Sequence, residues 1–180
     1  MRLVKHLTVH DFSFQNTSEK HLSLDDVFQR VLRFMSHDPH GEFRFMIGTD
    51  SHVYRKHTTF VTGVVIQRMG KGVWACYRKQ KESGQLGLRD KITKETQLTQ
   101  NVAAYFDEVK EAEMKKIITP YPGASLIREC HLDIGMEKRN KTSIFVDEMM
   151  KVIESVGYEA KIKPYSFVAS HYANYYTKLG

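Results

Sequence analysis

Hydrophobic residues recur at helical spacing in the segment that follows Ser23. They fall three or four positions apart and so share one face of a helix. The apolar positions on that face are Leu24, Val27, Val31 and Met35. The Ser23 hydroxyl can cap the first turn, and Asp25 and Asp26 place negative charge where the helix dipole favours it. The pattern therefore predicts a helix that begins after Ser23 and ends at the turn over residues 38–41.

Three segments rich in β-branched and aromatic residues come next. They span residues 43–50, 58–69 and 73–79. Gly70 and Gly72 bracket the short connection between the second and third segments, as is typical of a hairpin turn. We therefore predict a three-stranded antiparallel meander.

Helices and strands alternate in the second half of the chain. A helix is expected to open at Thr93 and to keep apolar residues at helical spacing through Val109, and another is expected to end at Gly157. A fourth strand over residues 125–135 lies between them, a fifth over 158–163 follows, and a last helix runs from about Ser166 to Leu179. Helix crossovers join parallel strands. The order thus predicts an α/β fold with a five-stranded mixed sheet flanked by helices and an extra N-terminal helix.

Composition indicates the size of the domain and the surroundings in which it folds. The 180 residues are expected to form one domain over residues 41–180, preceded by an N-terminal extension, residues 1–40, that carries the first helix. The net charge of +6 favours polyanionic partners such as nucleic acid. Cys76 and Cys130 lack metal-binding or disulfide spacing and are predicted to be small buried side chains in a reducing compartment. No apolar segment has the length of a membrane span, so we expect a cytoplasmic protein with no membrane partner.

Three carboxylates occupy positions that suggest chemistry. Asp50 ends the first strand, Asp133 ends the fourth, and Glu95 is expected in the first turn of a helix, on the same side as Leu98. Each also has an ordinary explanation. Asp50 and Asp133 could be turn residues at strand ends, and Glu95 could interact with the helix dipole.

These carboxylates would meet if the fourth strand were parallel to the first. Asp50 and Asp133 would then leave the sheet side by side at its carboxyl edge, the usual place for a site in α/β proteins. Glu95 would reach the same point from the covering helix. Clustered carboxylates repel one another unless they share a cation. The pattern therefore predicts a Mg²⁺ or Mn²⁺ site with Asp50, Glu95 and Asp133 as metal ligands.

The same residues carry a resemblance to a known family. Thr49-Asp50-Ser51 at the end of a strand, the meander, Glu95 and Asp133 follow in an order that resembles the ribonuclease H-like superfamily. More narrowly, the segments IGTDSH (residues 47–52) and ASHYAN (residues 169–174) are similar to the YkuK family of bacterial RNase H-like proteins, and this resemblance covers nearly the whole chain. It implies a one- or two-metal phosphodiesterase site in which Asp50, Glu95 and Asp133 are catalytic and Asp50 bridges the ions.

Enzymes of this superfamily usually add a fourth group from the last helix, commonly an acid or a histidine. By α-helical spacing, Phe167, His171 and Asn174 share one face of that helix. His171 could complete the catalytic set as a ligand or proton carrier, and Asn174 could offer a neutral oxygen to the metal. A histidine held between helix and sheet is the structural alternative. No aspartate or glutamate follows Pro164, which weakens the charge of a second metal site.

Basic residues flank the expected site. They are Arg55 and Lys56 in the first hairpin loop, Arg89, Lys91 and Lys94 before Glu95, and Lys138, Arg139 and Lys141 after Asp133. Such groups hold phosphates without reading bases. The leading hypothesis is a Mg²⁺- or Mn²⁺-dependent nuclease that hydrolyses phosphodiester bonds in RNA, DNA or a hybrid. The alternatives are a catalytically weak or inactive nucleic-acid-binding or protein-interaction module, and a small-molecule phosphoesterase.

Overall fold

A computed structural model describes residues 14–137 and 141–179 of the chain. Its centre is a five-stranded sheet in the order β3-β2-β1-β4-β5. The strands are β1 (Glu42–Val53), β2 (His57–Arg68), β3 (Gly72–Ser83), β4 (Ser125–Leu132) and β5 (Glu159–Lys161). The first three pair antiparallel, whereas β1–β4 and β4–β5 pair parallel. The predicted mixed sheet, with its meander followed by parallel crossovers, is confirmed.

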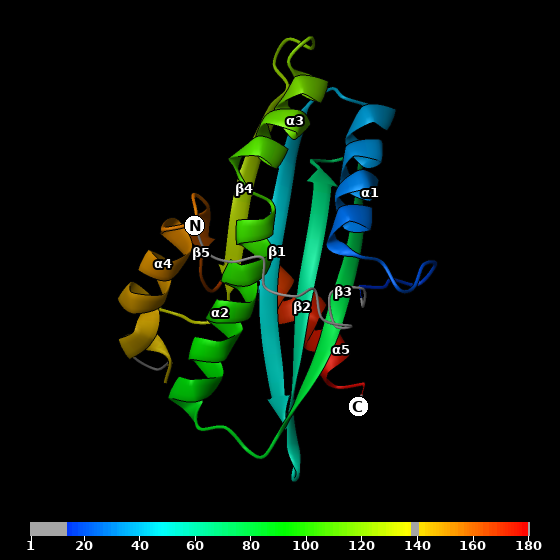
Figure 1. Ribbon diagram of the computed structural model, residues 1–180. Helices are drawn as coiled ribbons and strands as arrows, with labels where there is room; N and C mark the ends of the chain where they lie inside the picture. The colour runs from blue at the N-terminus through cyan, green and yellow to red at the C-terminus, as the bar shows by residue number, and fades with distance from the viewer. Residues whose placement is uncertain (1–13, 138–140, 180) are drawn as a thin grey trace, which may run out of the picture.

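Helices cover the two faces of the sheet unequally. One face carries α1 (Leu24–His37), α2 (Leu88–Tyr105), α3 (Glu108–Ile118) and α4 (Val146–Glu154), the last preceded by the 3₁₀ turn η2 (Ser143–Phe145). The other face carries the π-helix η3 (Val168–Ala173) and α5 (Asn174–Thr177), seen in red behind the strands in Figure 1. On this second face the last helical segment, η3 with α5, packs directly against β1 and β2.

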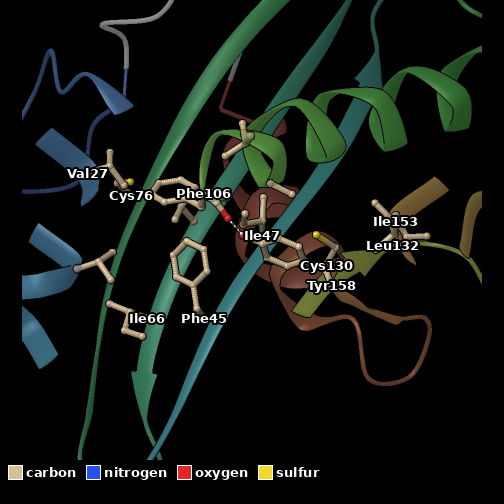
Figure 2. Close-up of a cluster of buried hydrophobic side chains, with 14 of the residues drawn as sticks. Val27, Phe45, Ile47, Ile66, Cys76, Phe106, Cys130, Leu132, Ile153 and Tyr158 are labelled. Atoms are coloured by element: carbon tan, nitrogen blue, oxygen red, sulfur yellow. Dashed lines mark hydrogen bonds between the residues drawn. The ribbon is translucent and has the colours of Figure 1, made fainter. Parts of the chain in front are cut away.

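The main hydrophobic core lies between the sheet and the larger helical layer. Figure 2 shows Phe45 and Ile66 of the sheet below Phe106, and Val27 of α1 beside Cys76. Tyr158 donates a hydrogen bond of 3.0 Å to the carbonyl oxygen of Phe106, which ties the end of α2 to the start of β5. Because α1 contributes to the same core as the strands, burial of apolar surface stabilises the N-terminal helix and the sheet together.

The first helix forms as its sequence predicts. Ser23 and Asp26 make a capping box, in which the Ser23 hydroxyl accepts from the Asp26 N–H and the Asp26 carboxylate accepts from the Ser23 N–H. These bonds satisfy N–H groups that the first turn cannot pair internally. The buried side consists of Val27, Phe28, Val31 and Met35.

Helix α2 begins at Leu88, five residues before the predicted start at Thr93. Ile92, which is 2% exposed, extends the buried side of the helix towards its N-terminus. Glu95 therefore lies in the second turn and not in the first. The prediction that placed it beside the helix N-terminus was wrong, and the helix dipole no longer explains a carboxylate there.

The expected long helix through Val109 is in fact two helices. After α2 ends, Asp107 caps α3 by accepting a hydrogen bond of 3.1 Å from the Lys110 N–H. Val109 lies in the first turn of α3 and is 67% exposed, so its predicted place on the buried side was wrong.

The last helical segment also departs from the predicted regular α-helix. In the π-helix η3 the N–H of Asn174 bonds to the carbonyl oxygen of Ala169, five residues earlier. A π-turn is wider than an α-turn, so α-helical spacing no longer places Phe167, His171 and Asn174 on one face. Phe167 lies against the His131 ring, with ring centroids 5.2 Å apart.

Two glycines allow this segment to approach the sheet. A Cβ atom on Gly48 of β1 would lie 2.9 Å from the Ala169 nitrogen, and one on Gly63 of β2 would lie 2.7 Å from the Tyr172 ring. Side chains at these positions would push the last helix away. The glycines therefore set how near the helix comes to the carboxyl end of β1.

Two further predictions concern membrane-spanning helices and the two cysteine thiols. Within residues 14–137 and 141–179, no helix combines the length and apolarity that crossing a bilayer requires. Cys76 and Cys130 are free and buried, as predicted. Burial raises the pKa of both thiols.

Candidate functional site

Asp50 and Asp133 lie at the same edge of the sheet. The parallel register of β1 and β4 pairs Thr49 with Leu132 as its last step, so Asp50 and Asp133 are the next residues along the two segments. This is the arrangement expected when the fourth strand runs parallel to the first. Asp133 directly follows the end of β4, whereas Asp50 lies inside β1, which continues to Val53 beside β2. The prediction that Asp50 ends its strand was therefore wrong. The charge of Asp133 raises the pKa of both Asp50 and Glu95, as described next.

Asp50 is 3% exposed and makes one side-chain hydrogen bond to the last helix. Its Oδ2 accepts from the Asn174 side-chain amide at 2.8 Å. Burial raises the pKa of Asp50, and the charge of Asp133 raises it further, whereas the Asn174 bond acts in the opposite direction. Asn174 therefore supports the charged form of a carboxylate that its surroundings otherwise disfavour.

Glu95 reaches the same edge from α2. Ser51, the residue after Asp50, donates a hydrogen bond of 2.5 Å to Glu95 Oε1. Burial first, and the charge of Asp50 second, raise the pKa of Glu95 from its ordinary 4.5 to about 8, and Asp133 adds to the effect. Lys91, one helical turn earlier, lowers the pKa of both Glu95 and Asp50. At neutral pH the Glu95 carboxyl holds a proton in most molecules.

A chain of threonine hydroxyls fixes α2 against the sheet beneath Glu95. Thr99 of α2 donates to Thr49 of β1 at 2.8 Å, and Thr49 lies 2.9 Å from Thr62 of β2. All three side chains are buried. Because Thr99 is one turn after Glu95, this bonding sets the position of the carboxyl relative to β1. Sequence reasoning passed over these threonines, although Thr49 directly precedes Asp50.

Asp133 has a basic partner that the sequence did not single out. The Lys163 ammonium lies 3.2 Å from Asp133 Oδ1, an ion pair with one half-exposed member. The same oxygen is buried and accepts no hydrogen bond with suitable angles. Lys163 follows the short strand β5 in the chain, so the pair closes the site on the β5 side.

His171 does not join the three carboxylates in the described structure. Its side chain is exposed, and its Nδ1 lies 2.9 Å from the hydroxyl of Ser170. Asn174, three residues on, is the residue of the last helix that contacts Asp50. Its amide nitrogen, and not its oxygen, faces the carboxylate.

The flanking basic residues are divided between paired and exposed groups. Arg89 is 3.2 Å from Glu148 of α4, and Lys94 is 2.7 Å from Glu82 of β3. Arg55 and Lys56 are exposed in the β1–β2 loop, and Lys141 is exposed after Asp133. The predictions for Lys138 and Arg139 lie outside the described residues.

The side-chain oxygens at this edge are of the chemical type that binds a divalent cation, but their present positions do not form a complete metal site. Carboxylate and amide oxygens are what Mg²⁺ and Mn²⁺ prefer, and a cation would relieve the repulsion that raises the pKa of Asp50 and Glu95. Yet in residues 14–137 and 141–179 no three His, Cys, Asp or Glu side chains lie close enough to hold one. Each carboxylate instead contacts a different partner, namely Asn174, Ser51 or Lys163. Metal binding therefore requires rotation of these side chains.

Comparisons with known proteins agree with the fold. The sequence model of the family described as "Ribonuclease H-like" matches residues 26–178. Over 170 residues the chain is 39% identical to a protein of Bacillus subtilis (strain 168) named "Uncharacterized protein YkuK", which covers 93% of this chain and 98% of that protein. No solved structure matches the chain.

Proposed function

This chain belongs to the ribonuclease H-like family, and we propose that it hydrolyses phosphodiester bonds in nucleic acid with Mg²⁺ or Mn²⁺ held at the carboxyl edge of β1 and β4. The observation that carries the proposal is Glu95. It is a buried carboxyl in the body of α2, beside Asp50 and Asp133, and its pKa is raised to about 8. Burying an ionisable carboxyl on a helix lowers the stability of the protein. Groups with strongly shifted pKa values cluster at functional sites.

The proposed ligands are Asp50, Glu95 and Asp133, with Asn174 as a further oxygen donor after rotation of its amide. A divalent cation held there would supply Lewis-acid polarisation of the phosphoryl oxygen and lower the pKa of water. Glu95 would release its proton to solvent in order to hold the cation. Lys163, now paired with Asp133, would be free to hold a phosphate oxygen.

The remaining residues position the substrate. Lys91 and the exposed loop residues Arg55 and Lys56 hold phosphates of the strand on either side of the reacting one, which gives affinity without sequence preference. His171, exposed one turn before Asn174, carries a proton to the leaving oxygen. The buried free thiols fit a reducing compartment, so we place the protein in the cytoplasm.

The test is cleavage of end-labelled RNA, DNA and RNA–DNA hybrid by purified protein with Mg²⁺, with Mn²⁺, or with EDTA. We expect Mn²⁺- or Mg²⁺-dependent cleavage that Asp50→Asn abolishes. Asp147→Asn, at an exposed aspartate of α4, is the matched control and should keep full activity. Thermal unfolding would verify that Asp50→Asn is folded, as expected because burial already disfavours the Asp50 charge. Cleavage that survives Asp50→Asn would overturn the proposal.

A non-catalytic nucleic-acid-binding module is the second candidate. It is favoured by the absence of a three-ligand group among the described residues and by the lack of an acid after Pro164. This function predicts equal binding of nucleic acid with and without EDTA and no hydrolysis of any of the three substrates. Divalent-dependent turnover that requires Asp50 would exclude it.

A further inference from the structure

A pocket of about 700 Å³ lies at the other end of the sheet from Asp50. Its walls come from α1, the end of β2, the β2–β3 turn and the start of β3. Arg68 in this pocket pairs with Phe43, seven residues before Asp50 along β1. At about 3.3 Å per residue the two sites are about 23 Å apart. The volume is within the range of small-molecule sites.

The charge of the pocket is positive. Four basic side chains, Arg30, Arg33, Arg68 and Lys71, face two acidic ones, Glu19 and Asp38. The acids are already neutralised, since Arg30 lies 2.7 Å from Glu19 and Arg68 lies 2.7 Å from Asp38. Arg33 and Lys71 are exposed, and neither forms an ion pair within the described part of the chain. These two cations are therefore available to an anion.

Aromatic side chains form the inner wall. Phe34 of α1 and Trp74 of β3 both line the pocket, are half-buried, and pack against the main core. Because the core fixes their positions, they present a preformed surface for a flat ring. Stacking on such side chains is how proteins commonly hold nucleic-acid bases.

The end of α1 adds hydrogen-bond acceptors. The helix ends at His37, which also lines the pocket, and the last carbonyl oxygens of a helix have no partner within it. Their partial negative charge disfavours a phosphate beside them and suits the amino groups of a base. The phosphate is thus assigned to Arg33 and Lys71, and the base to the aromatic wall.

We propose that this pocket is a second nucleotide-binding site, in which a base lies against Trp74 and Phe34 and its phosphate is held by Arg33 and Lys71. The inference does not rest on the proposed hydrolysis. The nucleotide could come from solution or from a nucleic-acid strand that extends to this end of the molecule. The chemistry recognised is the same in both cases.

Trp74 is the only tryptophan in the chain, so its fluorescence reports on the pocket directly. We would titrate the Asp50→Asn protein in EDTA with AMP, with UMP, and with a short single-stranded DNA. This design removes hydrolysis and metal binding from the measurement, and failure of the proposed function leaves it unaffected. We expect saturable quenching, weakened about tenfold by Arg33→Gln and by Lys71→Gln, because each removes a charge-assisted hydrogen bond.

Lys151→Gln is the matched control, since Lys151 is an exposed lysine of α4, a helix that does not line the pocket. It should leave quenching by the mononucleotides unchanged. Quenching by AMP or UMP assigns a free nucleotide, and quenching by the oligonucleotide alone assigns a strand. The proposal is overturned if none of the three ligands quenches Trp74, or if both substitutions leave the affinity unchanged. Equal binding of inorganic phosphate and AMP would also overturn it, because the aromatic wall would then contribute nothing.

Discussion

Replacing Glu95 with glutamine should remove much of the pH dependence of the protein's stability. Burial and the charge of Asp50 raise the pKa of Glu95 from 4.5 to about 8 in the folded protein. In the unfolded chain this carboxyl loses its proton at its ordinary pKa. Between the two values the folded state binds more protons than the unfolded state. The free energy of unfolding therefore falls as pH rises through this window.

The size of the effect follows from the two pKa values of Glu95. Each pKa unit corresponds to about 1.4 kcal/mol, so a shift from 4.5 to about 8 destabilises the ionised folded protein by up to about 5 kcal/mol. Below about pH 4.5 the carboxyl is neutral in both states, and Glu95→Gln, which has the same shape and can still accept from Ser51, should be about as stable as wild type. Above about pH 8 the variant should be more stable by several kcal/mol.

Urea unfolding in EDTA, followed by circular dichroism at about pH 5, 7 and 9, measures the difference between wild type and variant. Glu113→Gln makes the same chemical change at an exposed glutamate of α3 and serves as the control. We expect the stability gain of Glu95→Gln to grow with pH and that of the control to stay near zero. A gain that is the same at all three pH values would refute the reasoning, because Glu95 would then not hold a proton in the folded state.

Binding of Mn²⁺ should release close to one proton at neutral pH and tighten up to about tenfold per pH unit below about pH 8, because Glu95 must ionise. Calorimetry in two buffers measures both quantities, and a pH-independent affinity would contradict the assignment. Asn174→Asp should bind Mn²⁺ more tightly and be less stable in EDTA, because it sets a second carboxylate against Asp50 at the present hydrogen-bond distance of 2.8 Å. Thermal unfolding with and without Mn²⁺ tests this, and weaker binding would count against the site. Gly48→Ala should lower stability by about 1–3 kcal/mol, because its methyl group would lie 2.9 Å from the Ala169 nitrogen. Wild-type stability in urea would mean that the last helix can move away freely.

Much of the fold could be predicted because local patterns agree with the topology. The capping residues of α1 and the glycine turn between β2 and β3 are readable one segment at a time. The pairing of β4 beside β1 follows from the helical crossover between them. The neighbourhood of Asp50 and Asp133 was predictable from the parallel register of β1 and β4, although β1 runs on past Asp50 to Val53 because it continues to pair with β2.

The details of the site depend on contacts between distant segments. The start of α2 at Leu88 was missed because polar residues surround Ile92, and this placed Glu95 in the wrong turn. The ion pair of Lys163 with Asp133 depends on the course of the chain after β5, for which no periodicity exists. The position of His171 depends on the π-helix, and α-helical spacing cannot indicate one.

The pocket at the other end of the sheet was missed for a related reason. Arg33 and Phe34 appear in the sequence as ordinary residues of α1, and Lys71 as part of a turn. Only the packing of α1 against the start of β3 brings them beside Trp74. A binding site made from several separate segments leaves no pattern in any one of them.

The proposed function requires Asp50, Glu95 and Asp133 to hold a divalent cation together. Anomalous X-ray scattering from crystals soaked in Mn²⁺ above about pH 8, where Glu95 is ionised, tests this directly. We expect an anomalous peak between Asp50 and Asp133 in wild type and no peak there in Asp50→Asn. A wild-type structure with Asp50 and Asp133 well ordered and no peak between them would contradict it.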